Sequence, residues 1–203
     1  MSKGYALAYR FGITPWERAG TAGEEQLAAL LDREQRAHPE LGRALDLGCG
    51  RGTHSIALAR RGWQVTGVDV VPRALTTARK RADQAGQKVR FLEGDVTNLP
   101  PEIGSGYRLV LDIGCFHGLS DEQRVRMGRQ VTAVTDPNAT MLVLCFVPGG
   151  RGPLPRGADS TDLLHAFPGW SIVDEEAAES AGMPGPLRHR DPTFYRLQRS
   201  ETV

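Results

Sequence analysis

The chain has 203 residues, of which 40% are hydrophobic and 24% charged, and its formal net charge at pH 7 is +1. This length suits one domain, and the composition, with a mean hydropathy of −0.34, is ordinary for a globular protein and argues against disorder. The longest apolar run, residues 139–148, is about half of what a bilayer-spanning helix needs, and the first residues do not resemble a signal peptide.

The predicted elements alternate along most of the chain. The first 20 residues mix aromatic residues with Gly and Pro, which predicts a short helix and a loop. Helical spacing of apolar residues then predicts helices at residues 24–36, 53–61, 72–84, 121–134 and 161–167. Short apolar runs predict strands at residues 43–47, 64–68, 89–92, 109–111, 140–147, 170–173 and 194–198.

This order predicts the fold class. Strands separated by helices form βαβ units, so we expect an α/β protein with a parallel sheet that is covered on both faces. The last two strands lack such a helix between them, and we expect them to pair antiparallel at one edge of the sheet. The whole chain is interpreted as one domain.

The most informative segment is a glycine loop in the sequence LDLGCGRGT, residues 45–53. An apolar strand leads into Gly48, Gly50 and Gly52, and a helix follows. Glycines at such a turn allow a ligand to approach the backbone beside a helix N-terminus. The dinucleotide fingerprint GxGxxG requires a glycine where this chain has Thr53, which argues against an NAD-binding protein.

Two acidic residues follow the next two predicted strands. Asp69 ends the second strand, where it would lie beside the glycine loop and accept hydrogen bonds from both hydroxyls of a ribose. Asp95 ends the third strand and is placed to accept the exocyclic amine of adenine, with the Val96 N–H reaching a ring nitrogen.

With these motifs the sequence resembles the class I S-adenosylmethionine-dependent methyltransferases. The matching segments are LDLGCGRGT (45–53), VTGVD (65–69), FLEGDV (91–96) and YRLVLDIGCFH (107–117). The resemblance covers residues 40–199 in element order. It implies a doubly wound, Rossmann-like sheet with strand order 3-2-1-4-5-7-6 and an antiparallel strand 7.

The resemblance also implies the cofactor, S-adenosylmethionine, with S-adenosylhomocysteine as the product. Asp46 and the glycine loop would hold its methionine part, Asp69 its ribose, and Asp95 with Val96 its adenine, while Val70 packs on the adenine face. The full set implied for the cofactor is Asp46, Gly48, Cys49, Gly50, Gly52, Asp69, Val70, Asp95, Val96 and Asp112.

Candidates for catalytic residues lie after the fourth predicted strand. Transfer of a sulfonium methyl group needs alignment and exclusion of water more than a catalytic triad. His117 is the candidate catalytic residue, either as a base or as a group that orients the substrate. A histidine that only hydrogen-bonds a backbone carbonyl remains the alternative. Cys115 is interpreted as a packing residue.

The N-terminal residues carry a second resemblance. The segment ITPWE, residues 13–17, is similar to the TPW segment of thiopurine-, thiol- and halide-type small-molecule methyltransferases, in which an N-terminal arm closes over the cofactor. Tyr9 and Trp16 are therefore candidates for a lid, although Trp16 is equally an anchor to the core. Ile113 stands where thiopurine-type enzymes tend to have arginine, which puts a thiopurine substrate in doubt. Arg151 is a candidate for contact with an acidic substrate or for a solvated loop position.

The sequence thus predicts a methyltransferase for a small-molecule acceptor with an O, S or N nucleophile. Its parts are an N-terminal arm (1–38), a cofactor-binding core (39–148) and a substrate-side segment (149–203). The alternative is a non-catalytic module that binds the cofactor as a sensor or binds a partner protein. Balanced charge and scattered histidines predict no nucleic-acid partner and no metal. An odd number of cysteines without a signal peptide predicts a cytoplasmic protein with reduced thiols. We expect no membrane association and a monomer or homodimer.

Overall fold

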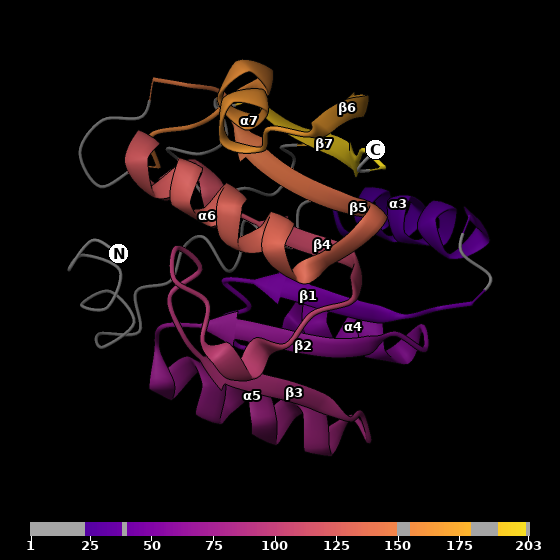
Figure 1. Cartoon of the computed structure of the whole chain (residues 1–203). Coiled ribbons are helices and arrows are strands. Elements are labelled where there is room, and N and C mark those ends of the chain that lie inside the picture. Colours follow the sequence, from indigo (N-terminus) through magenta and orange to yellow (C-terminus); the bar gives the residue numbers. More distant parts are fainter. Residues whose placement is uncertain (1–22, 38–39, 150–154, 180–190, 202–203) are drawn as a thin grey trace.

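A seven-stranded sheet forms the centre of the molecule (Figure 1). The computed structural model describes residues 23–37, 40–149, 155–179 and 191–201. The strand order is β3-β2-β1-β4-β5-β7-β6, with β7 antiparallel to both of its neighbours and the other pairs parallel. This confirms the predicted sheet. The strands are β1 (Arg43–Leu47), β2 (Gln64–Asp69), β3 (Val89–Glu93), β4 (Tyr107–Ile113), β5 (Thr135–Phe146), β6 (Trp170–Ala177) and β7 (Pro192–Arg199).

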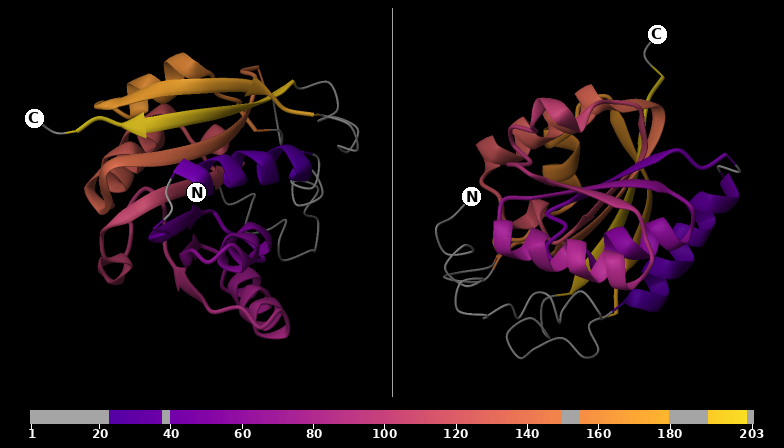
Figure 2. Two further views of the ribbon diagram at one scale, coloured as in Figure 1. Left: turned by 90° about the vertical axis from the view of Figure 1, so that its right-hand side faces the viewer. Right: turned by 90° about the horizontal axis from the view of Figure 1, so that it is seen from below.

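Helices cover both faces of the sheet, as the two turned views make plain (Figure 2). One apolar cluster packs α3 and α4 against β1, β4, β5 and β7, and a second packs α4 and α5 against β3. A third cluster packs α6 and α7 on the opposite face. The helices are α3 (Glu24–Ala37), α4 (Thr53–Arg60), α5 (Pro72–Gln84), α6 (Asp121–Val134) and α7 (Ser160–Ala166), with short 3-10 turns η1 (Pro101–Ile103) and η2 (Phe116–Gly118).

Local sequence explains where several helices begin. α5 begins with Pro72 at its first position, where a missing N–H costs no hydrogen bond. α6 begins at a capping box, in which Ser120 and Gln123 exchange side chain to backbone hydrogen bonds. Among the described residues, none of the helices has the length and apolar character that crossing a membrane requires.

The pairing of the strands brings the carboxyl ends of β1, β2 and β4 together at one edge of the sheet. In the register of β1, Leu47 lies opposite Val68 of β2 and Asp112 of β4. The chain runs from β1 outward to β3 and then returns to β4 on the other side of β1. Ligands of open α/β sheets bind at such a reversal, beyond the carboxyl ends of the strands.

The largest departure from the predicted strands is in β5. The apolar pattern predicts residues 140–147, whereas β5 begins at Thr135. Its first part includes Pro137 and Asn138, which has a φ of 62°, and neither residue type favours a strand. Pairing with β4, which is irregular at this end, therefore extends β5 where local preference does not.

One buried ion pair joins α3 to strand β7 of the sheet. Glu34, 1% exposed, accepts two hydrogen bonds from Arg196 of β7, at 2.5 Å from Nε and 3.2 Å from Nη2. Arg196 also donates to the Thr140 hydroxyl at 3.4 Å. This bidentate pair fixes α3 over β5 and β7.

Candidate functional site

The glycine loop turns tightly at the carboxyl end of β1. Gly48, Gly50 and Gly52 have φ values of 68°, 52° and 77°, a region that favours glycine. A Cβ on Gly52 would lie 2.9 Å from the Phe91 ring, and a Cβ on Gly48 would lie 2.9 Å from the Cys115 Cβ. The loop is thus held between β3 and the segment after β4.

Several backbone amides of this loop donate hydrogen bonds to carbonyl groups of the protein itself. Gly48 and Cys49 both donate to the carbonyl oxygen of Val68, at 2.9 and 3.0 Å, and Gly52 donates to the carbonyl of Cys49. The Cys49 side chain is buried in the cluster with α4 and α5. The buried side chain of Cys49 therefore helps to fix the shape of the loop.

Asp69 closes the loop from the side of β2. Its Oδ2 accepts from the Gly50 N–H at 2.9 Å and its Oδ1 from the Val71 N–H at 2.8 Å. The residue is 8% exposed. Since a carboxylate accepts up to about four hydrogen bonds, the group that caps the loop also suits the two hydroxyls of a ribose.

Asp95 and Val96 follow β3 in a turn of their own. The Asp95 Oδ1 accepts from the Thr97 N–H at 2.8 Å, and its carbonyl accepts from Asn98. Val96 is buried, whereas Val70, after β2, is half-buried. The structure therefore brings these two turns, after β2 and β3, to the same edge as the glycine loop.

Two further carboxyl groups lie beneath the loop. Asp46 is 2% exposed and accepts from the Ser55 hydroxyl at 2.5 Å; burial raises its pKa to about 6, with the Asp69 charge adding to the effect. Asp112 is fully buried and accepts from the backbone N–H groups of Cys115 and Phe116. Burial, with the Asp46 charge, raises the pKa of Asp112 to about 7.

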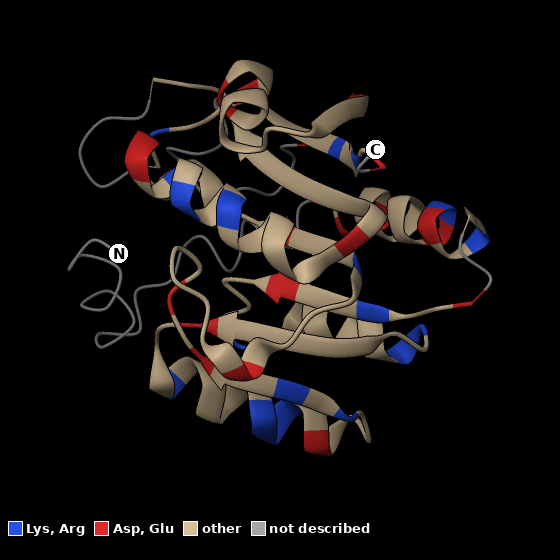
Figure 3. Cartoon of the chain, in the orientation of Figure 1, with Lys and Arg blue, Asp and Glu red and all other residues tan. Residues whose placement is uncertain are grey.

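This edge of the sheet is therefore acidic. Figure 3 shows acidic residues at the arrowhead ends of β1, β2 and β3. The charges of Asp46, Asp69, Asp95 and Asp112 all act on the half-buried Cys115 and, after burial itself, raise the pKa of its thiol well above the ordinary value. Such a site favours a cationic ligand over an anionic dinucleotide.

The segment after β4 places His117 inside the protein. His117 is 2% exposed, its Nδ1 accepts from the Phe146 N–H at 3.4 Å, and its ring packs on that of Phe146 with centroids 5.1 Å apart. Ile113, the last residue of β4, is half-buried against the cluster that includes α3. The segment is thus anchored at the carboxyl end of β5.

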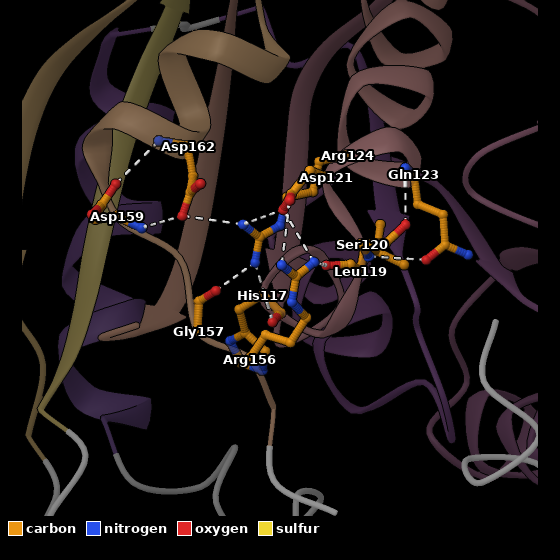
Figure 4. A network of polar contacts seen from close by, with 10 residues as sticks. All are labelled: His117, Leu119, Ser120, Asp121, Gln123, Arg124, Arg156, Gly157, Asp159 and Asp162. Atoms are coloured by element: carbon orange, nitrogen blue, oxygen red, sulfur yellow. Dashed lines mark hydrogen bonds and ion pairs between the residues drawn. The ribbon is translucent and has the colours of Figure 1, made fainter. Parts of the chain in front are cut away.

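A buried arginine that was absent from the predicted site ties this segment to the one after β5 (Figure 4). Arg124 of α6 is 4% exposed, and its Nη2 donates to the carbonyls of His117 and Gly157. The sequence held a signal for it: Arg124, Met127, Gly128 and Val131 are the buried residues of α6, a helical stripe in which a charged residue needs buried partners.

Three predicted residues, Tyr9, Trp16 and Arg151, lie outside the described residues. Arg156, which the structure does describe, pairs with Asp121 at 3.1 Å and donates to the Leu119 carbonyl. Within the described ranges, no group of three or more His, Cys, Asp or Glu side chains is arranged to hold a metal ion.

Comparison with known proteins agrees with this geometry. Residues 44–138 match the family model described as a methyltransferase domain. An uncharacterized methyltransferase of Schizosaccharomyces pombe is 33% identical over 102 residues, which cover 50% of this chain and 70% of the relative. The demethylmenaquinone methyltransferase of Thermus thermophilus is 34% identical over 112 residues, 54% of this chain and 50% of the relative.

The same fold occurs in a solved structure. The 1,6-didemethyltoxoflavin-N1-methyltransferase of Burkholderia thailandensis, with S-adenosylhomocysteine bound, superposes with a TM-score of 0.73 at 21% identity, covering 97% of this chain and 86% of the other. Sheet order and glycine-loop edge together define a Rossmann-like fold. The chain belongs to the class I S-adenosylmethionine-dependent methyltransferases. It spans 50% of the Thermus relative's length.

Proposed function

We propose that this protein transfers the methyl group of S-adenosylmethionine to a small-molecule acceptor through an O, S or N nucleophile. The observation that carries the proposal is the glycine loop capped by Asp69 through the Gly50 N–H, with the buried Asp46 just before the loop bonded to Ser55 of α4. Relatives whose names state methylation of demethylmenaquinone and of a toxoflavin precursor support a small acceptor. The free thiols of the three cysteines, Cys49, Cys115 and Cys145, are compatible with a protein that functions in the cytoplasm.

The residues present fit this cofactor. Asp46 and the glycine loop would hold its methionine part, Asp69 its ribose, and Asp95 with Val96 its adenine. The acidic edge suits the positive charge of a sulfonium. When bound, S-adenosylmethionine supplies an activated methyl group, which the acceptor's lone pair takes as the carbon–sulfur bond breaks. The protein's own part is to align the acceptor and exclude water.

We expect S-adenosylhomocysteine to bind with micromolar affinity and NAD not to bind, because the GxGxG spacing departs from the dinucleotide fingerprint and an acidic edge disfavours the negatively charged diphosphate of NAD. Isothermal titration calorimetry with both ligands checks this. Tight NAD binding without a response to S-adenosylhomocysteine would overturn the proposal. Turnover with a panel of thiols, phenols and amines, with an RNA oligonucleotide beside them, separates the enzyme from a non-catalytic sensor that only binds the cofactor.

We expect Asp69→Ala to weaken S-adenosylhomocysteine binding by about 1.5–3 kcal/mol, the range for hydrogen bonds to a charged group. This corresponds to a rise in Kd of about 10- to 150-fold. Calorimetry measures it, with Asp83→Ala as the matched control, since Asp83 is an exposed carboxylate at the C-terminal end of α5. Unchanged affinity in Asp69→Ala would leave Asp69 as a loop cap alone.

We also propose that the first 20 residues of the N-terminal arm cover the cofactor, as the TPW resemblance implies, whereas α3, which the predicted arm (1–38) includes, packs on the sheet. Limited proteolysis and amide exchange, with and without S-adenosylhomocysteine, test this. We expect protection of residues 5–16 only when the ligand is bound, because methyl transfer benefits from excluding water and release of product needs an opening. Equal protection in both states would make Trp16 an anchor to the core.

A further inference from the structure

The segments that follow β4 and β5 share one buried anchor, Arg124 (Figure 4). Its Nη2 donates to the carbonyl of His117, at 3.5 Å, and to that of Gly157. Its Nη1 pairs with Asp162 of α7 at 3.1 Å, and its guanidinium lies 5.1 Å from the centre of the Phe116 ring. One side chain therefore connects three parts of the chain: η2, the segment that follows β5, and α7.

The backbone completes the connection between these segments. The Gly157 N–H donates to the His117 carbonyl at 3.1 Å, so that carbonyl has two donors. The next amide, of Ala158, donates to the carbonyl of Phe146 at 2.9 Å. The Phe146 N–H in turn donates to the His117 Nδ1. Arg124 is thus connected to the imidazole of His117 through a closed set of hydrogen bonds.

This last bond decides where the imidazole carries its proton. A nitrogen that accepts a backbone N–H must present its lone pair, so the neutral ring carries its proton on Nε2. A Cβ added to Gly114 would lie 3.7 Å from that Nε2. Gly114 directly follows β4, so the Nε2 side of the ring lies beside the carboxyl end of that strand, where the acceptor is expected to bind.

We propose that His117 acts toward the methyl acceptor as a hydrogen-bond donor through Nε2–H, and that Arg124 is the positioning residue that holds it in this state. The inference rests on the proposed methyl transfer. It selects acceptors that ionise in water and keep a lone pair for the Nε2–H besides the one that attacks, such as a thiolate or the phenolate of an acidic phenol. The acceptor's proton, where it has one, goes to water and not to His117.

The direct test is two-bond ¹⁵N–¹H NMR of the imidazoles in the full chain, free and with S-adenosylhomocysteine, with His117 assigned from the signals missing in His117→Gln. We expect the pattern of the Nε2–H tautomer at neutral pH. Arg124→Met should replace it with a mixture of tautomers. The matched control is Arg126→Met, because Arg126 lies on the same helix, half exposed, with a single ion pair to Glu122.

A proton on Nδ1, or on both nitrogens, in the wild-type protein would overturn the inference, as would Arg124→Met signals identical to wild type. If Arg124→Met fails to fold by circular dichroism, Arg124→Lys and the wild-type tautomer still decide the question. Absent S-adenosylhomocysteine binding with the Nε2–H tautomer intact would refute the proposed function and leave the geometry in place.

Kinetics separate a donor from a base. With two phenols of different acidity, the ascending limb of the kcat/KM pH profile should follow each phenol's own pKa. His117→Gln should raise the acceptor KM about tenfold and leave the Kd of S-adenosylhomocysteine unchanged. A limb that stays at one pH for both phenols and disappears in His117→Gln would show that His117 is a base.

Discussion

Glu34→Ala should lower the free energy of unfolding by about 3–5 kcal/mol, the cost of removing one partner from a buried ion pair. The substitution leaves the guanidinium of Arg196, whose side chain is 18% exposed, without its carboxylate. Urea unfolding at pH 7 measures the change.

Two variants show that the loss arises from the uncompensated charge. In Glu34→Leu combined with Arg196→Met both charges are removed, and stability should largely return. Arg33→Ala removes a neighbouring ion pair to Asp174 and Glu176 that is 47% exposed on the arginine side, and it should cost about 1 kcal/mol or less. A Glu34→Ala loss no larger than that of Arg33→Ala would contradict the expectation.

Asp46→Asn should make the protein more stable relative to wild type as pH rises from about 4 to about 8. Burial raises the pKa of Asp46 from the ordinary 3.8 to about 6, so the folded state retains a proton that the unfolded state has released. In wild type this contribution is complete below the unfolded pKa and is lost as pH rises through about 6. The expected difference is about 3 kcal/mol, from 1.36 kcal/mol for each pKa unit.

Urea unfolding of both proteins at pH 4, 6 and 8 measures this difference. Asp112 has a raised pKa as well, so the variant should keep part of the wild-type slope. Asp121→Asn is the opposite control, because the neighbouring Arg156 lowers the pKa of that exposed carboxyl. Parallel pH profiles for wild type and Asp46→Asn would show that Asp46 is ionised in the folded state at no cost.

Apolar runs and helical spacing predicted the order of helices and strands along the chain, because each βα unit has a local signature, whereas the strand order within the sheet was implied by the resemblance to the class I methyltransferases. Residues 43–47 and 72–84 were predicted with the bounds that β1 and α5 have. The strand predicted at 170–173 was too short, since β6 continues to Ala177 through three consecutive acidic residues, 174–176. Its pairing with β7 supplies what local preference does not, and such pairing cannot be read from the strand's own residues.

The residues of the site likewise fall into those that the sequence predicts and those that it does not. Glycines and acids at strand ends have short-range signatures, so the loop and Asp69 were identified from spacing. The role of Arg124 depends on carbonyls at positions 117 and 157, the second of which is 33 residues away. The tautomer of His117 depends on one amide of β5. No short motif encodes these two contacts, because each partner is a main-chain atom of a distant segment, and any residue there supplies the same atom.

That property has a consequence for how this protein can change. Arg124 binds the main-chain oxygens of His117 and Gly157, so residues beside the acceptor whose side chains it does not contact can be exchanged without loosening this frame. Gly114 and Gly157 are exceptions, since their φ values are +96° and +83° and a Cβ on Gly157 would collide with the Val147 oxygen; Phe116 is another, because it is fully buried against the Arg124 guanidinium. A laboratory search for new acceptor specificity should therefore randomise positions 113, 115 and 147 while Gly114, Phe116, Arg124 and Gly157 stay fixed.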